Sequence, residues 1–327
     1  MGRLRSQAAA LVAAVVLFGV VTPLMTATPA SAAVRASSAA RAWGATAQQP
    51  CDPLDGSQCM LPFPDDYYTV PDPATTTGLR VSLPAAAFPA AVGGTPFNPL
   101  PWNGNDGFSP GSTILTHVPG LDLRSSHVAT LSDIGDSLKT TSPVILLDTT
   151  TGQRWPTWSE LDVTDHDAAT QLLIVHPARN LTEGDHYVVA LRNLKTSTGA
   201  AIAPAAAFAD ALGRGPTVRA VSSADVAHLR GDLTTLARAA VSRSGMFLAW
   251  DFTVASTKNI TGPALTMRDQ TFSTLGHSVG PYLVTQVVND PPGQPDLARE
   301  VLGYFDVPSY LTGAGGALGT VLSTGTD

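Results

Sequence analysis

The chain has few charged residues, and it lacks the motifs of several large enzyme classes. Only 14% of its 327 residues are charged, and acids outnumber bases, so the formal net charge is −7. An acidic surface argues against binding to nucleic acid or to an anionic membrane. No phosphate-binding loop, no glycine-rich dinucleotide fingerprint and no metal-spaced group of His and Cys occurs. We therefore expect no cofactor, no bound metal and no nucleic-acid partner.

Long apolar runs are absent except near the N-terminus, where one such run has a secretory context. Arg3 and Arg5 precede the apolar stretch AAALVAAVVLFGVV, and the small-residue site ASA (30–32) follows it. This order predicts a cleaved signal peptide over residues 1–32 and a secreted or cell-envelope location; a retained membrane anchor is the alternative. Cleavage removes two arginines and no acid, so the net charge changes from −7 to −9. The mature chain has no other stretch that is long enough to span a bilayer.

Cysteine is almost absent, and the two that occur, Cys51 and Cys59, lie close together. In an exported protein a close pair favours a small disulfide loop. A metal site would need more ligands than Asp52 and Asp55, the acids within CDPLDGSQC. We expect a disulfide here.

Glycine and proline are abundant, at 29 and 26 residues, which favours short strands and many turns over a helical bundle. Alternating apolar residues around 172–175 and 187–191 predict two strands on either side of a polar turn. Leu181, Gly184 and Tyr187 form the pattern of a tyrosine corner, in which the phenol crosses a sandwich corner and bonds to upstream backbone. The sequence therefore predicts a mainly β protein with an Ig-like or fibronectin-like antiparallel β-sandwich.

The periodicity changes after residue 200 and indicates an α+β extension. Ser222 and Asp225 predict a capped helix, and a second helix is expected over 261–275 with Thr261 as its N-cap. Asp251 interrupts an apolar strand at 246–256, so we expect this strand to be half buried or Asp251 to be paired. The expected organisation is a signal peptide (1–32), a flexible leader (33–50), the β-sandwich (51–200), the α+β extension (201–312) and a Gly-rich tail (313–327).

An acidic loop precedes the first of the two strands around the corner motif. Asp162, Asp165, His166 and Asp167 offer oxygen and nitrogen donors for a cation. Nothing in the sequence fixes their geometry, so we interpret the segment as a solvated loop.

The segment GHSVG (276–280) matches the G-x-S-x-G elbow of serine hydrolases, with Ser278 in the nucleophile position. That chemistry needs a strand, a sharp turn and then a helix, which hold the serine exposed beside backbone N–H donors. Here the predicted helix precedes the serine, a strand follows, and no histidine occurs after His277. We expect no catalytic residue; a secreted serine esterase or lipase that uses Ser278 is the alternative. The upstream histidines have no neighbouring signature and are interpreted as surface or strand-face residues: His117, His127, His176, His186 and His228.

Four segments carry a resemblance to a known family. They are LPFPDD (61–66), DGFSPGS (106–112), LIVHPARNLTEGDHYVVALRNL (173–194) and LAWDFTVAS (248–256). With these motifs the chain resembles the Ig-like N-terminal region of secreted bacterial lipases, the virulence factor lipase N-terminal type. It is similar also to exported α/β-hydrolase-like proteins in which the same region precedes a hydrolase half.

The resemblance implies a fold and a context but no activity. The hydrolase half has no counterpart here, so no catalytic residue carries over. It implies an exported, non-catalytic accessory module of a truncated lipase- or esterase-like protein, with a hydrolase domain or an envelope or lipid ligand as partner. A free-standing binding module and a non-functional remnant are the other interpretations.

Overall fold

The computed structural model describes residues 51–54, 58–88, 90, 93–94, 96–215, 221–276, 278 and 280–313. The predicted signal peptide, the predicted leader and residues 314–327 of the predicted tail lie outside the described residues. Two residues of the GHSVG segment, His277 and Val279, also lie outside them.

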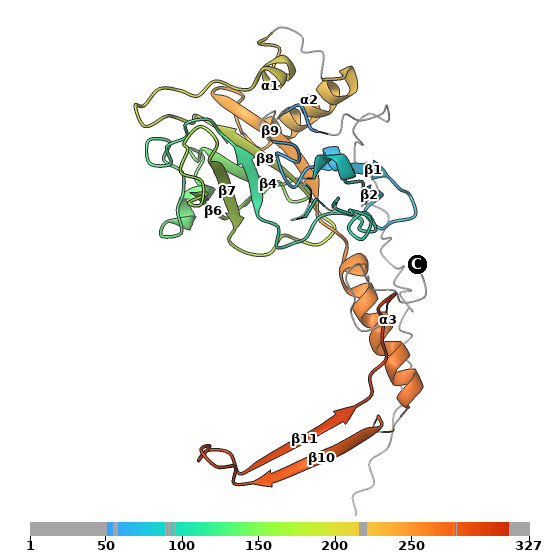
Figure 1. The fold of residues 1–327 in the computed structure, drawn as a ribbon. Helices are drawn as coiled ribbons and strands as arrows, with labels where there is room; N and C mark the ends of the chain where they lie inside the picture. The colour runs from blue at the N-terminus through green and yellow to red at the C-terminus, as the bar shows by residue number, and fades with distance from the viewer. Residues whose placement is uncertain are drawn as a thin grey trace, which may run out of the picture. The chain divides into compact units, whose positions relative to one another are not determined.

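Two antiparallel sheets form the body of the protein (Figure 1). The three-stranded sheet has the order β3 (Ile114–His117), β7 (Leu172–Pro177), β6 (Thr157–Leu161). The four-stranded sheet has the order β5 (Arg154–Trp155), β4 (Val144–Asp148), β8 (His186–Arg192), β9 (Met246–Thr253). Residues from both sheets share one hydrophobic core. The predicted mainly β class, an antiparallel sandwich with an α+β segment, is confirmed.

Two strands of the four-stranded sheet, β4 and the edge strand β9, are covered on both faces. Every residue of β4 and of β9 is buried, which explains why these strands read as nearly continuous apolar runs. Beyond the facing sheet, the cover comes from α1 (Ala206–Ala211) and α2 (Ser223–Arg238), both of which contact β9. The capping box expected at Ser222 and Asp225 is present at the start of α2.

The chain changes sheets between β7 and β8, at the predicted corner motif. β7 pairs with β3 and β6, whereas β8 pairs with β4 and β9, so these two strands do not form a hairpin with each other. The Tyr187 hydroxyl accepts a hydrogen bond from the backbone N–H of Thr182 at 2.9 Å, the kind of contact expected of a tyrosine corner. Leu181 is buried, and Gly184 has a φ of +77°, which favours glycine.

The sandwich extends past the boundary expected at residue 200. β9 pairs with β8 along its length, so a strand that the sequence placed in the α+β extension completes the four-stranded sheet. The alternating residues of β9 in the sequence indicate a strand. They do not indicate which strand it pairs with, because that partner, β8, is separated from it by a long connection.

The N-terminal part of the body packs around β9. Cys51 and Cys59 form the expected disulfide. A 3-10 helix, η1 (Asp66–Tyr68), precedes a ribbon of two short strands, β1 (Thr69–Pro71) and β2 (Leu79–Val81). The indole Nε1 of Trp250 donates to the carbonyl of Pro64 at 2.9 Å, which joins this segment to β9. Two further 3-10 turns are η2 (Ala85–Ala87) and η3 (Ile134–Leu138).

The Pro-rich loop before β3 is held by aromatic rings and by one close backbone approach. Phe97 packs between Phe88 and Trp102, at centroid distances of 4.3 and 5.0 Å. A Cβ on Gly107 would come within 2.6 Å of the Ala255 backbone nitrogen, so only glycine fits there.

Three elements follow the sandwich: α3 (Thr257–Leu275), β10 (Tyr282–Asn289) and β11 (Arg299–Phe305). The N-cap of α3 is Ser256, not Thr261 as the sequence suggested; Thr261 lies inside the helix and its hydroxyl donates to the carbonyl of Thr257. Among the residues that the structure describes, β10 and β11 pair only with each other, in a two-stranded antiparallel sheet. We call residues 257–313 the C-terminal segment.

Candidate functional site: a buried histidine–aspartate cluster

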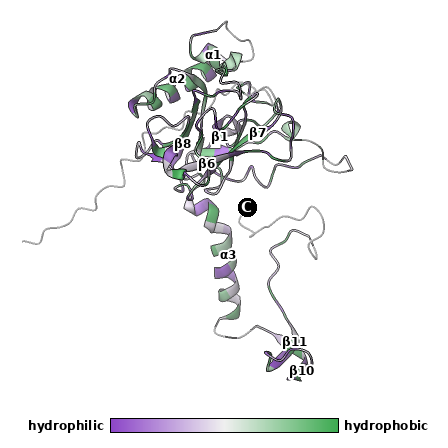
Figure 2. Cartoon of the chain, turned by 90° about the vertical axis from the view of Figure 1, so that its left-hand side faces the viewer, coloured by the Kyte–Doolittle hydropathy of each residue, from purple (hydrophilic) through white to green (hydrophobic). Residues whose placement is uncertain are grey.

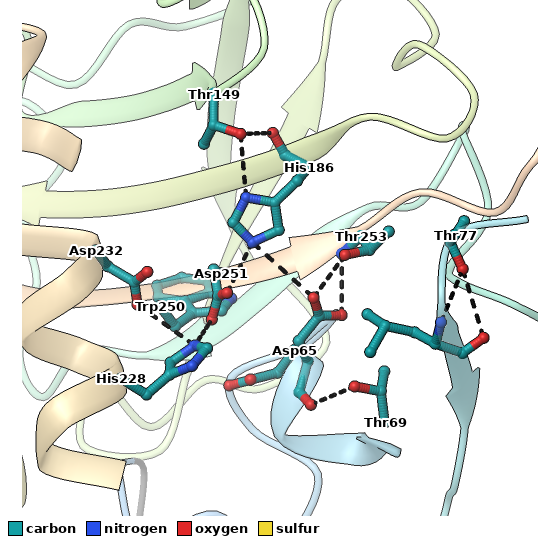
Figure 3. Close-up of polar contacts among 12 residues, drawn as sticks. Asp65, Thr69, Thr77, Thr149, His186, His228, Asp232, Trp250, Asp251 and Thr253 are labelled. Carbon is teal, nitrogen blue, oxygen red and sulfur yellow. Dashed lines mark hydrogen bonds and ion pairs between the residues drawn. The ribbon is translucent and has the colours of Figure 1, made fainter. Parts of the chain in front are cut away.

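Five ionisable side chains lie together where η1, α2 and the four-stranded sheet meet. Figure 3 labels four of them, His186, His228, Asp232 and Asp251. η1 supplies an aspartate, β8 a histidine, β9 the central aspartate, and α2 a histidine and an aspartate one helical turn apart. We call them the His–Asp cluster: Asp66, His186, His228, Asp232 and Asp251.

Asp251 is the centre of the cluster. Its Oδ1 lies 2.6 Å from Nε2 of His228, and its Oδ2 lies 2.7 Å from Nε2 of His186. Each imidazole has a second carboxylate further away: Asp232 Oδ2 at 3.8 Å from His228 Nε2, and Asp66 Oδ2 at 4.0 Å from His186 Nε2. Acids and bases therefore alternate along the cluster, with one shared carboxylate between two imidazoles.

The pairing of strands and the pitch of α2 bring these groups together. In the sheet, His186 lies opposite Thr253, two residues from Asp251, so the imidazole and the carboxylate share one face. On α2, His228 and Asp232 are four residues apart and therefore lie on the same side of the helix. Asp66 is held by β9 itself, because its two oxygens accept from the backbone N–H and the hydroxyl of Thr253, at 3.0 and 2.6 Å.

Hydrogen bonds around His186 determine its charge. The Thr149 hydroxyl donates its proton to the His186 carbonyl at 2.9 Å, so at its 3.1 Å contact with Nδ1 the same oxygen accepts. Nδ1 therefore carries a proton. Nε2 donates to the Asp251 carboxylate, and a ring protonated at both nitrogens is an imidazolium cation.

The pKa values follow from burial and from the shared carboxylate. Burial alone would lower the pKa of His186 and of His228, but the charge and hydrogen bonds of Asp251 raise both to about 9. Burial would raise the pKa of Asp251, but the two imidazolium groups hold it well below its usual range. Burial and the charge of Asp251 raise the pKa of Asp66 to about 6 and that of Asp232 well above its usual range. The cluster therefore places two imidazolium groups among three carboxyl groups, and the charge of Asp251 is balanced on both sides.

A second pair of buried acids lies nearby. Burial and the neighbouring carboxylate of Asp52 raise the pKa of Asp65 well above its usual range. Asp65 Oδ1 accepts from the Tyr67 N–H at 2.7 Å, and Asp52 Oδ1 accepts from the Leu54 N–H at 2.8 Å. The interior between the disulfide loop and β9 is therefore rich in acid.

The structure places Ser278 in a different setting from the cluster. Ser278 is exposed, and its backbone N–H donates to the carbonyl of Leu275, the last residue of α3. Gly276 ends α3 with a φ of +57°, as expected for the residue after a helix. A helix precedes the serine and β10 follows, so the order is the reverse of a nucleophile elbow.

The acids of the loop 162–171 serve its own turns. The carboxylates of Asp162, Asp165 and Asp167 each accept from a backbone N–H two residues further on. This is the hydrogen bonding of ordinary Asx turns. Within the described ranges, the groups of His and acids close enough to share a metal ion both belong to the His–Asp cluster.

Sequence reasoning missed the His–Asp cluster. His228 was interpreted as a surface or strand-face residue, but it is buried, with 5% of its surface exposed. One signal in the sequence did point toward the cluster. Asp251 is an acid inside an apolar strand, and we expected either that the strand is half buried or that Asp251 is paired. Asp251 has two partners, His186 and His228, which lie 65 and 23 residues away from it in the chain.

The cluster is suited to holding protons or a cation, because it joins imidazole and carboxylate groups that are mostly buried, without a serine or cysteine nucleophile among its members. Comparison with protein-family models, with curated proteins and with solved structures gave no match for this chain.

Proposed function

We propose that the chain is an exported, non-catalytic β-sandwich module that acts as the accessory part of a secreted lipase- or esterase-like protein. In this proposal the C-terminal segment docks against an α/β-hydrolase domain. The observation that carries the proposal is the two-faced apolar surface of β10 and β11.

The strand pair presents large apolar side chains on both faces. Directly opposite residues of an antiparallel pair share a face, and successive residues point to opposite faces. Tyr282 lies opposite Phe305, and Leu283 lies opposite Tyr304, so aromatic or aliphatic pairs occupy each face. Tyr282, Tyr304 and Phe305 are 69%, 72% and 73% exposed. An isolated two-stranded ribbon is marginal in water, and a ribbon with two apolar faces needs cover on both.

Helix α3 also exposes large apolar side chains. None of its residues is buried, yet it carries exposed large apolar side chains at Ile260, Leu265 and Phe272. In Figure 2 apolar and polar stretches alternate along this helix. A helix and a ribbon that both lack cover fit a three-layer α/β arrangement, in which helices lie on both faces of a sheet.

Two observations support a non-catalytic role. Four of the histidines considered as bases have other partners: His186 and His228 contact Asp251, His176 contacts Glu160, and His117 contacts the carbonyl of Ala169. The reversed order of elements around Ser278 leaves that serine without the strained turn that the chemistry needs.

The disulfide supports export, because such bonds persist in oxidising compartments. Separately, the helices in the described part of the chain are too short or too polar to cross a membrane.

The test begins with the DNA beyond codon 327, where an α/β-hydrolase reading frame is expected, in frame or frameshifted. The chain and that domain are produced together, and their complex is measured by size-exclusion chromatography with light scattering. A 1:1 complex is expected, and Leu283→Asp with Tyr304→Asp should abolish it. Matched controls are Leu131→Asp and Val163→Asp, which place charges on sandwich positions that are 64% and 76% exposed. Absence of such a reading frame, or equal binding by the segment variant, contradicts the proposal.

A further inference from the structure

One oxygen of the His–Asp cluster lacks the contact that its surroundings require. Oδ2 of Asp232 is buried and accepts no hydrogen bond from any residue that the structure describes. The residue itself is 6% exposed, and this oxygen points at Nε2 of His228 from 3.8 Å, too far for a hydrogen bond. A buried carboxylate oxygen without a partner is costly, so the site calls for a further positive group.

Three ligand atoms converge on this oxygen's side of the cluster. One ligand atom each of His228, Asp232 and Asp251 lie within 4.8 Å of one another. In a tetrahedral site with bonds of about 2.0–2.2 Å, ligand atoms lie about 3.3–3.6 Å apart. The recorded distances from Nε2 are 2.6 Å to Asp251 and 3.8 Å to Asp232, on either side of that value. Rotamer adjustments of roughly 1 Å or less would equalise them.

We propose that His228, Asp232 and Asp251 bind a divalent transition-metal ion, of the class that prefers imidazole and carboxylate ligands, and thereby clamp α2 to β9. His228 and Asp232 form one chelating face, because they are one turn apart on the same helix. Zinc and cobalt suit such a mixed nitrogen and oxygen site. Nε2 of His228 carries the proton of its hydrogen bond to Asp251 and would release that proton to solvent on metal binding. The ion would then replace this hydrogen bond and would give Oδ2 of Asp232 its missing partner.

The outer contacts of the site are those of a supported metal ligand. Asp251 keeps its second oxygen on Nε2 of His186 at 2.7 Å, and Nδ1 of His186 is fixed by Thr149. Such partners orient a ligating carboxylate and restrict its rotation.

The other half of the cluster is a poorer site. Asp66, His186 and Asp251 are also close enough to share an ion. Both oxygens of Asp66, however, already accept hydrogen bonds from Thr253, at 3.0 and 2.6 Å. A metal ion bound there would displace the hydrogen bonds between Asp66 and Thr253. Oδ2 of Asp232 makes no hydrogen bond to a described residue, so a metal ion bound there displaces none.

The experiment uses the full exported chain and the metals themselves as probes. The protein is unfolded in chelator and refolded with zinc, with cobalt or with chelator alone, so that burial does not block entry. About one equivalent of bound zinc is expected by mass spectrometry of the metal, with a cobalt absorption band from a four-coordinate site. At a hundredfold excess over Kd, the zinc form should melt about 5 °C or more above the chelator form.

Asp232→Asn should reduce zinc affinity at least about tenfold, by analogy with the loss of a metal-orienting group. Asp269→Asn, an exposed acid on α3, is the matched control and should bind zinc like the unaltered chain. The cobalt spectrum of the unaltered chain keeps the proposal testable should the Asp232 variant misfold. The proposal is overturned if the chain binds almost no zinc and has the same melting temperature in zinc and in chelator. It is also overturned if the Asp232 variant folds and binds zinc as tightly as the Asp269 control. Neither outcome affects docking of the C-terminal segment, which lies outside this site.

Discussion

Raising the pH removes protons from His186 and His228, and the metal-free protein should lose stability as it does so. Both folded-state pKa values are about 9, against about 6.5 in an unfolded chain. The stabilisation from each protonated histidine is therefore fully present below pH 6.5 and is lost as the pH rises through 9. The effect is the reverse of the usual acid denaturation, because here the folded state holds the proton more tightly.

The size of the loss follows from the two pKa values. The difference between 6.5 and about 9 corresponds to roughly 3 kcal/mol for each histidine. The two histidines share the carboxylate of Asp251, so the joint effect is below twice that figure, and about 3–6 kcal/mol is expected. With a urea m-value of about 2–3 kcal/mol/M, the midpoint of unfolding should fall by about 1–3 M between pH 6.5 and 9.

The measurement is urea unfolding at a series of pH values in chelator, followed by tryptophan fluorescence, to which the buried Trp250 contributes. Both cysteines are in the disulfide, so no thiol titrates in this range. Asp251→Asn serves as the comparison: it should be about 3–5 kcal/mol less stable at pH 6.5, since it leaves two buried imidazoles without their anion, and its midpoint should change little up to pH 9. A midpoint of the unaltered protein that stays constant from pH 6.5 to 9 would refute the reasoning.

Three further predictions concern the fold and the unused serine. Tyr187→Phe removes the acceptor of a backbone N–H and should lower the free energy of unfolding by about 1–3 kcal/mol in urea, whereas Tyr304→Phe, at an exposed ring, should change it by less than about 0.5 kcal/mol. Replacing Cys51 and Cys59 by serine opens a loop with a sequence separation of 8 and should cost about 2–3 kcal/mol, seen as a lower melting temperature that reductant no longer changes. Ser278→Ala should leave the turnover of p-nitrophenyl esters at the same background as the unaltered chain; activity that disappears in the variant would establish a serine esterase instead.

Features determined by neighbouring residues were predictable from the sequence. The capping box at Ser222 and Asp225 depends on residues three apart, and it is where the pattern placed it. Both strands expected around the corner motif are present, as β7 and β8. The start of α3 was wrong for a physical reason: Ser256 caps it, and the Ser256 N–H and hydroxyl donate to Asp106, a residue 150 positions earlier. The sequence around Thr261 does not indicate the contact between Ser256 and Asp106.

The His–Asp cluster could not be predicted from local sequence patterns, because its members come from distant parts of the chain. Asp251 was noticeable because it interrupts an apolar strand, but its partners come from β8 and α2 and are selected by strand pairing and helix packing. His186 and His228 have unremarkable neighbours in the sequence. The extent of the sandwich was misjudged likewise, because β9 reaches β8 across a connection that contains two helices.

The contacts between the N-terminal part of the body and β9 set an order of events during synthesis. Pro64 and Asp66 bond to Trp250 and Thr253, residues 186 and 187 positions later, and Asp106 bonds to Ser256. Until the chain has been made to about residue 256, these early segments have polar groups and apolar surface without their final partners. Long-range closure of this kind slows folding. The nascent chain would therefore remain open for most of its synthesis, until β9, one of the last strands of the body to be made, completes the folded sheet.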